Sequence, residues 1–287
     1  ISSNLQSLND FQKKSFELVQ ETNFPKLIYS LIMNQSLDLK SKSRVFRIFN
    51  ILTNKFFITE NLDFIEDEDF LNQLLTILQN YKPSENLDQN LFGLCFCSII
   101  NILQFYPNSI FYLNKSGITD YIATELINSE EMVTLSHSSR YILNLIHQTT
   151  DIEQKNFLLH QTVVRLNETM ERRPLTFLLQ IILECMKDQP DARILLVEEN
   201  ICGKCIDIIL MMKKTEIFTQ FYGDYAIQIL SFISNEGNDN EFQILLDSDV
   251  FEVFFHTFYN FLDISPDIKV DSDSYDYICS FLIGAIG

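Results

Sequence analysis

The sequence predicts an all-α protein in which short helices stack as repeats along the chain, an α-solenoid. Glycine and proline number only seven and six among 287 residues, whereas sandwiches, barrels and dinucleotide-binding folds need many of them. The chain also repeats a pattern of helix, turn and helix at intervals of roughly 40 to 50 residues, as helical-repeat proteins do. Its 46% hydrophobic composition supplies every repeat with residues to bury against its neighbours.

The first half of the pattern is a polar corner between two helices. Asp69, Gly117, Asn200 and Asp249 hold the corner position, and a weaker copy places Asn23 before a Phe-Pro pair. Glycine adopts left-handed backbone angles freely, and Asn and Asp tolerate them best among side chains, so we expect left-handed corners. Apolar residues flank the four stronger corners: Ile65 and Phe70, Leu113 and Ile118, Leu196 and Ile201, and Leu245 and Val250.

The second half of the pattern is an apolar helix that carries one polar residue at a fixed place. That residue is, in order, Asn50, Asn101, Asn144, Glu184, Ser231 and Ser280. We interpret the whole chain, 1–287, as a single repeat domain, because each unit buries its apolar face only by stacking on the next. The approximate units are 1–38, 39–84, 85–130, 131–172, 173–218 and 219–265, with a partial unit 266–287. Its apolar last residues predict that the natural chain continues.

These repeats resemble those of the armadillo family, which have a short first helix, a corner, a second helix and a longer third helix. In one unit the three helices would span 108–114, 118–128 and 136–148. The resemblance implies a right-handed superhelix of about five to six armadillo-like repeats, with third helices lining a concave groove. The unit around 151–171 is short and has no clear corner, and the variable repeat length leaves a HEAT-like or mixed solenoid as an alternative.

Some repeats, notably residues 229–249, look like those of importin-α. In that family, third helices carry a Trp and, four residues on, an Asn, which together clamp an extended basic peptide. The Asn matches here are Asn50, Asn101 and Asn144, and the Trp positions hold Phe46, Cys97 and Arg140. Because the chain has no Trp, the clamp is incomplete. A divergent nuclear-transport adaptor is therefore an alternative function.

The repeated Asn is also the best candidate for a binding site on the residues alone. A side-chain amide has two donors and an acceptor, so a row of amides can hold the backbone of an extended peptide. The alternative is that Asn50, Asn101 and Asn144 only bond neighbouring loops or each other. Arg47 and Arg140 lie close by and would suit an acidic segment or a partner helix. We therefore predict that these five residues bind a partner protein.

Charge and cysteine usage narrow the class of partner and the compartment. A net charge of −18 argues against nucleic acid and against an anionic membrane surface. The same charge suits a basic partner or simply keeps the chain soluble. The six cysteines lie in apolar surroundings, as reduced core residues do. We expect an intracellular subunit of a hetero-complex, cytoplasmic or else nuclear, cytoskeletal or ciliary.

The stretch Cys202-Gly-Lys-Cys205 has the spacing of zinc sites and redox-active thiols. A structural zinc site needs four ligands, and neither a second such pair nor a suitable pair of histidines accompanies this one. We therefore predict that both cysteines pack in the core, with a metal or redox site as the alternative. No nucleophile elbow, phosphate-binding loop or zinc-protease motif occurs. The sequence thus predicts a non-catalytic protein-interaction scaffold that uses no cofactor or metal.

Overall fold

The structure is a computed structural model that describes residues 24–53, 66–81, 86–106, 108–169, 171–188, 196, 199–212, 221–236, 243, 245–247, 249–253 and 255. Over these residues all regular structure is helical, and no strand is present. The all-α prediction is therefore confirmed. The chain divides into two compact units, Ile1–Thr149 (unit 1) and Thr150–Gly287 (unit 2).

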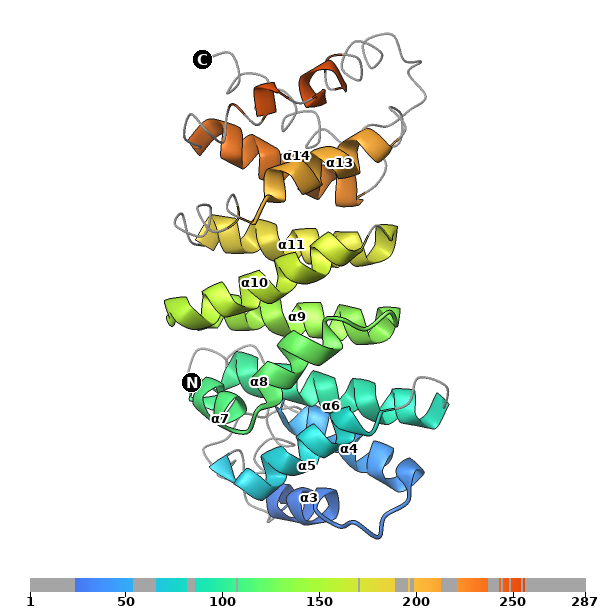
Figure 1. The fold of residues 1–287 in the computed structure, drawn as a ribbon. Helices are drawn as coiled ribbons and strands as arrows, with labels where there is room; N and C mark the ends of the chain where they lie inside the picture. The colour runs from blue at the N-terminus through green and yellow to red at the C-terminus, as the bar shows by residue number, and fades with distance from the viewer. Residues whose placement is uncertain are drawn as a thin grey trace, which may run out of the picture. The chain divides into compact units, whose positions relative to one another are not determined.

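Unit 1 is built around three long helices, α4 (Leu39–Thr53), α6 (Asn86–Phe105) and α9 (Met132–Gln148). Helix α6 packs against α4 and against α9, so the three helices form one layer (Figure 1). We call them the third helices of unit 1, after their place in each repeat. Shorter elements cover the layer: α3 (Phe24–Ile32), α5 (Glu68–Gln79), α7 (Ser109–Lys115), α8 (Ile118–Tyr121) and the π-helix η2 (Ile122–Leu126).

Unit 2 contains α10 (Ile152–Glu168), α11 (Arg172–Asp188), α13 (Ile201–Met211) and α14 (Phe221–Glu236). Helix α11 packs against both α10 and α14, and α13 packs against α14 (Figure 1). Helix α10 runs without a corner for 17 residues, Ile152–Glu168, and the carboxylate of Asp151 before it accepts hydrogen bonds from the backbone of Glu153 and Gln154. The short unit noticed in the sequence thus has one helix where other units have two.

Two of the predicted left-handed corners are confirmed. Gly117 has a φ of 78° and begins α8, and Asn200 has a φ of 60° and begins α13. At both positions a single residue in the left-handed region directly precedes a helix, and at Gly117 the preceding helix α7 ends two residues earlier, at Lys115. Among described residues, no other non-glycine residue has a positive φ.

The same prediction is wrong for Asp69 and Asp249. Asp69 lies in the first turn of α5, and the residue before that helix is Asp67, with extended angles (φ −79°, ψ 116°). The Asp67 carboxylate accepts a hydrogen bond from the Asp69 amide at 2.8 Å. The main-chain oxygen of Asp249 accepts one from the Val253 amide at 3.0 Å. Asp67 therefore starts α5 by capping it from extended angles, and Asp249 does not have a positive φ either. Asn23 lies outside the described residues.

The apolar residues that flank the corners form the core, as predicted. Every described member is fully buried: Phe70, Leu113, Ile118, Leu196, Ile201, Leu245 and Val250. Aromatic rings add edge-to-face contacts between helices, as between Phe49 of α4 and Phe70 of α5, whose centroids lie 5.5 Å apart. Ile65 lies outside the described residues. The corner pattern therefore predicts burial more reliably than it predicts backbone angles.

Helix bounds follow the expected three-helix unit closely. The first helix, expected at 108–114, is α7, Ser109–Lys115. The second, expected at 118–128, is α8 followed by the five-residue π-helix η2. The third, expected at 136–148, begins four residues earlier, at Met132. The last predicted polar residue, Ser280, lies outside the described residues. No described helix is both long and apolar enough to cross a membrane.

Candidate partner-binding face

The exposed side of the third helices of unit 1 brings together the residues predicted to bind a partner. Each of these helices buries one side and leaves the other open to solvent, so the three open sides form one surface. We call this surface the third-helix face. Its exposed and half-buried members include Lys40, Arg44, Arg47, Asn50 and Ile51 of α4, Leu94, Cys97 and Asn101 of α6, and His137, Arg140, Asn144 and His147 of α9.

Asn50 and Asn101 are bonded to each other across two helices. The Asn101 Nδ2 donates to Asn50 Oδ1 at 2.8 Å and to the Asn50 main-chain oxygen at 3.3 Å. It also lies 3.4 Å from Thr53 Oγ1. Both side chains are half-buried. This contact is the one expected if the Asn row stabilises neighbouring repeats. It still leaves the Asn50 amide NH₂ and the Asn101 amide oxygen available, because no bond to either is present among described residues.

Asn144 is on the same face but is not hydrogen-bonded to Asn101. Its Nδ2 donates to the main-chain oxygen of Arg140, one turn earlier in α9, at 2.8 Å. The Asn144 amide oxygen is left without a partner in the described part of the chain. The structure therefore joins two of the three predicted Asn side chains and holds the third by its own helix.

The positions that carry Trp in importin-α offer no aromatic surface here. Phe46 is only 1% exposed, and its ring packs edge-to-face on Phe49 with centroids 6.1 Å apart. Cys97 is half-buried, and Arg140 is exposed. The Asn side chains of the third-helix face therefore have no aromatic neighbour at this place.

Positive charge on α4 is greater than the predicted Arg47 alone would give. Lys40, Arg44 and Arg47 are exposed and Lys42 is half-buried, and α4 contains no carboxylate. No side chain of these four makes an ion pair or hydrogen bond within the described ranges. The repeat pattern predicts only Arg47 among these four cations. The carboxylate-free run 39–53, in a chain with 39 acidic residues, is the signal that could have identified them.

Helix α9 continues this charge with Arg140 and two histidines. The His137 ring stacks on Phe96, with centroids 5.4 Å apart and planes 17° apart. Desolvation lowers the pKa of His137, and the nearby Arg140 guanidinium lowers it further. His137 is therefore neutral near pH 7, and Arg140 supplies the fixed charge on this helix.

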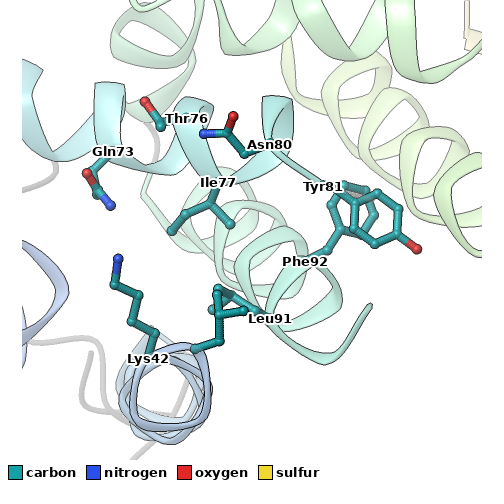
Figure 2. A pocket seen from close by; sticks show the side chains of 9 residues that line it. Lys42, Gln73, Thr76, Ile77, Asn80, Tyr81, Leu91 and Phe92 are labelled. Atoms are coloured by element: carbon teal, nitrogen blue, oxygen red, sulfur yellow. The ribbon is translucent and has the colours of Figure 1, made fainter. Parts of the chain in front are cut away.

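A pocket of about 170 Å³ opens between α4, α5 and α6, with Lys42 as its one charged lining residue. Figure 2 shows the Lys42 side chain extending toward Gln73. Tyr81 closes one end by stacking on Phe92, with centroids 4.0 Å apart, while its hydroxyl donates to Glu131 at 2.6 Å. An ammonium beside apolar and amide groups suits a small apolar group with an anionic end. The remaining lining residues are Leu39, Thr76, Ile77, Asn80 and Leu91.

The Cys202-Gly-Lys-Cys205 segment forms the first turn of α13 and packs in the core, as predicted. Cys202 is 1% exposed and Cys205 is fully buried. Burial raises the pKa of the Cys205 thiol well above its ordinary value, which disfavours the reactive thiolate. Lys204 Nζ donates at 3.3 Å to the main-chain oxygen of Asn167, near the end of α10 where a helix favours a cation.

The glycine of this segment also has a packing role. A Cβ at Gly203 would lie 2.7 Å from the Asn200 Oδ1, closer than real contacts allow. The absence of a side chain at 203 thus lets the Asn200 side chain lie against the first turn of α13. Across the part of the chain that the structure describes, no three His, Cys, Asp or Glu side chains gather as a metal site would require.

No protein-family model and no curated protein matches this sequence. Solved structures do match. One is an engineered protein, which matches with a TM-score of 0.61 at 13% identity. The match covers 92% of this chain and 97% of the engineered chain. A designed armadillo repeat protein in complex with the peptide (KR)4 has a TM-score of 0.60 at 12% identity, covering 92% and 100%. A computationally designed armadillo repeat protein for modular peptide recognition has a TM-score of 0.61 at 12% identity, covering 91% and 98%. The chain therefore has an armadillo-like repeat fold, an all-α solenoid.

Proposed function

We propose that this chain is a non-catalytic interaction scaffold whose third-helix face binds an extended segment of another protein. The observation that carries the proposal is the recurrence of Asn50, Asn101 and Asn144 at one place on three successive third helices. Each of them keeps an amide atom without a partner among described residues. Amides at repeat spacing can hold peptide groups of a partner whatever its side chains are.

Arg47 and Arg140 flank this row and add charged contacts to the partner. Both side chains are exposed, and neither has an ion-pair partner in the described residues, so both are available. A protein of similar fold is described in complex with a peptide, which supports peptide binding as a use of this architecture. We further propose that the scaffold works inside the cell as part of a larger assembly, since reducing conditions suit its buried free thiols.

No observation favours a nuclear-transport adaptor. A clamp for basic peptides needs aromatic surface beside the Asn side chains, and Phe46 is buried in the core instead. The exposed Arg47 and Arg140 would repel a basic peptide.

The experiment is a selection of extended peptides from a displayed library of random peptides, followed by affinity measurement with purified full-length chain. We expect the Asn101→Ala plus Asn144→Ala variant to bind the selected peptides about tenfold more weakly, since two hydrogen bonds to the partner backbone are lost. Asn156→Ala is the matched control, because Asn156 is exposed on α10 in unit 2. Unchanged affinity in the double variant would remove the Asn row from the proposal, and a library that yields no binder would refute the scaffold function.

A further inference from the structure

We infer that the segment bound by the third-helix face is acidic, with aliphatic side chains among its carboxylates. This inference rests on the proposed function and names the chemistry of its partner. Its basis is the contrast between a strongly anionic chain and the cationic, partly apolar face that its third helices present in unit 1.

The charge of these helices departs from that of the chain. The chain has 39 acidic and 21 basic residues, almost two acids for each base. The third helices of unit 1 reverse this ratio, because α4 and α9 contain no carboxylate and α6 contains only Asp88, at its start. Their exposed cations are Lys40, Arg44, Arg47 and Arg140, while Lys42 lines the pocket between α4, α5 and α6.

None of these cationic side chains forms an ion pair or hydrogen bond in the described ranges, so none stabilises the described structure through such a contact. Elsewhere in unit 1, by comparison, Lys115 pairs with Glu68. Like charges on one face repel one another and lower stability. A row of unpaired cations therefore has its clearest use in a contact with an anionic partner.

The positive charge is a property of unit 1 and not of every third helix. In unit 2, Glu184 of α11 occupies the place that Asn holds in the first three repeats. It pairs with Lys187 at 3.0 Å. Helix α14 has Asp224 near its start and no Lys or Arg. Burial raises the pKa of Tyr225, and the charge of Glu184 raises it further. An acidic segment is thus matched better to the third helices of unit 1, where five cations accompany one carboxylate, than to α11, where three cations accompany two.

The third-helix face also has apolar side chains, which can bind apolar groups of a partner. Ile51 is 56% exposed on α4, beside Asn50 and one turn after Arg47. Half-buried Leu94 continues this surface on α6. Aliphatic groups of the partner would cover these side chains, while its carboxylates meet the flanking guanidinium groups in charge-assisted hydrogen bonds.

A protein segment fits this face better than the other common anions. Nucleic acids and anionic membranes are extended surfaces of negative charge, and a chain with a net charge of −18 repels them beyond the small cationic area. A peptide places its few carboxylates only where the cations are. Its main chain also satisfies the amides of Asn50 and Asn101, which phosphates do not match in both donors and acceptors.

The test uses the peptide selection with full-length chain, with a library of random 12-residue peptides, and reads the composition of the enriched pool. We expect Asp and Glu to be enriched together with aliphatic residues, and binding to weaken as salt is added. We expect Arg47→Glu to weaken the best selected peptide about tenfold, because a charge-assisted contact becomes a repulsion. Lys26→Glu is the matched control. It changes the net charge by the same amount, and Lys26 is exposed on α3, outside the face.

The outcomes separate this inference from the proposed function. Enrichment of basic or neutral peptides that still depend on Asn101 and Asn144 would overturn the acidic partner and leave the scaffold standing. Equal weakening by Arg47→Glu and Lys26→Glu would also overturn it, because the effect would then follow net charge. Tighter binding of single-stranded oligonucleotide or phosphatidylserine vesicles than of any acidic peptide would overturn the choice of a peptide. A pool with no binder would refute both proposals.

Discussion

Replacing Gly117 by Ala should measurably destabilise the protein through its backbone alone. Gly117 has a φ of 78°, and a Cβ built there would meet no atom within 4 Å. No steric clash with a neighbour therefore enters the comparison. A left-handed residue with a side chain costs about 1–2 kcal/mol. Alanine also lowers the conformational entropy of the unfolded chain, which stabilises the folded state by about 0.4–1 kcal/mol. The net expectation is a loss of about 1 kcal/mol in the free energy of unfolding.

Urea unfolding of the full chain, followed by circular dichroism at the helical band, measures this loss by linear extrapolation. Gly117 lies in unit 1. If the two units unfold in separate transitions, only the transition of unit 1 should move to lower urea concentration. Gly117→Asn should lose less than the Ala variant, since Asn tolerates left-handed angles better.

Gly93→Ala is the matched control. Gly93 lies within α6, and its new Cβ would make ordinary contact with His137 Nε2 at 3.5 Å. A helix interior favours Ala over Gly by about 0.5–1 kcal/mol, so this variant should gain stability. The reasoning would be refuted if Gly117→Ala were as stable as the natural chain, or if both substitutions shifted stability in the same direction.

Two further predictions concern a hydrogen bond and a set of thiols. The Tyr29 hydroxyl donates to Asp67 at 2.6 Å, which lowers the pKa of Asp67 and raises that of Tyr29 to about 12. The bond should therefore stabilise the protein fully between the ordinary pKa values of the two groups, about 4 and 10. Its contribution should fade as pH falls through the lowered Asp67 pKa or rises through the raised Tyr29 pKa. Tyr29→Phe should lose about 1 kcal/mol at pH 7, with a smaller loss at pH 2; an equal loss at both would contradict this. Iodoacetamide followed by peptide mass spectrometry should modify half-buried Cys97 well before fully buried Cys205; faster labelling of Cys205 would restore the reactive-thiol hypothesis.

The repeat architecture can be predicted from the sequence because burial restricts the residue type at many positions at once. Seven described residues beside the corners are fully buried as the pattern requires. The backbone angles at the corners are harder to predict, because Asp has two uses at the start of a helix. It tolerates left-handed angles, but it also caps a helix from extended angles, as Asp67 does for α5. Residue type alone does not separate these uses, so the prediction of left-handed angles is wrong at Asp69 and Asp249.

The candidate site was predicted in part. The recurrence of Asn at the repeat spacing predicted the face, and Arg47 and Arg140 are exposed on it as expected. The bond between Asn101 and Asn50 depends on how closely α6 approaches α4, which follows from packing and not from spacing along the chain. The same holds for the pocket around Lys42, whose walls come from three helices. Whether these residues bind a partner stays a prediction.

The left-handed angles of Asn200 have an evolutionary consequence that the neighbouring Gly203 does not share. A Cβ at 203 would meet only the side-chain amide of Asn200, which is exposed and forms no cap hydrogen bond, so that amide can turn toward solvent. Substitution at 203 should therefore be tolerated during divergence. Position 200 is constrained instead by its φ of 60°, so related chains should keep Asn or Gly there, the two residues that this chain uses at its left-handed corners.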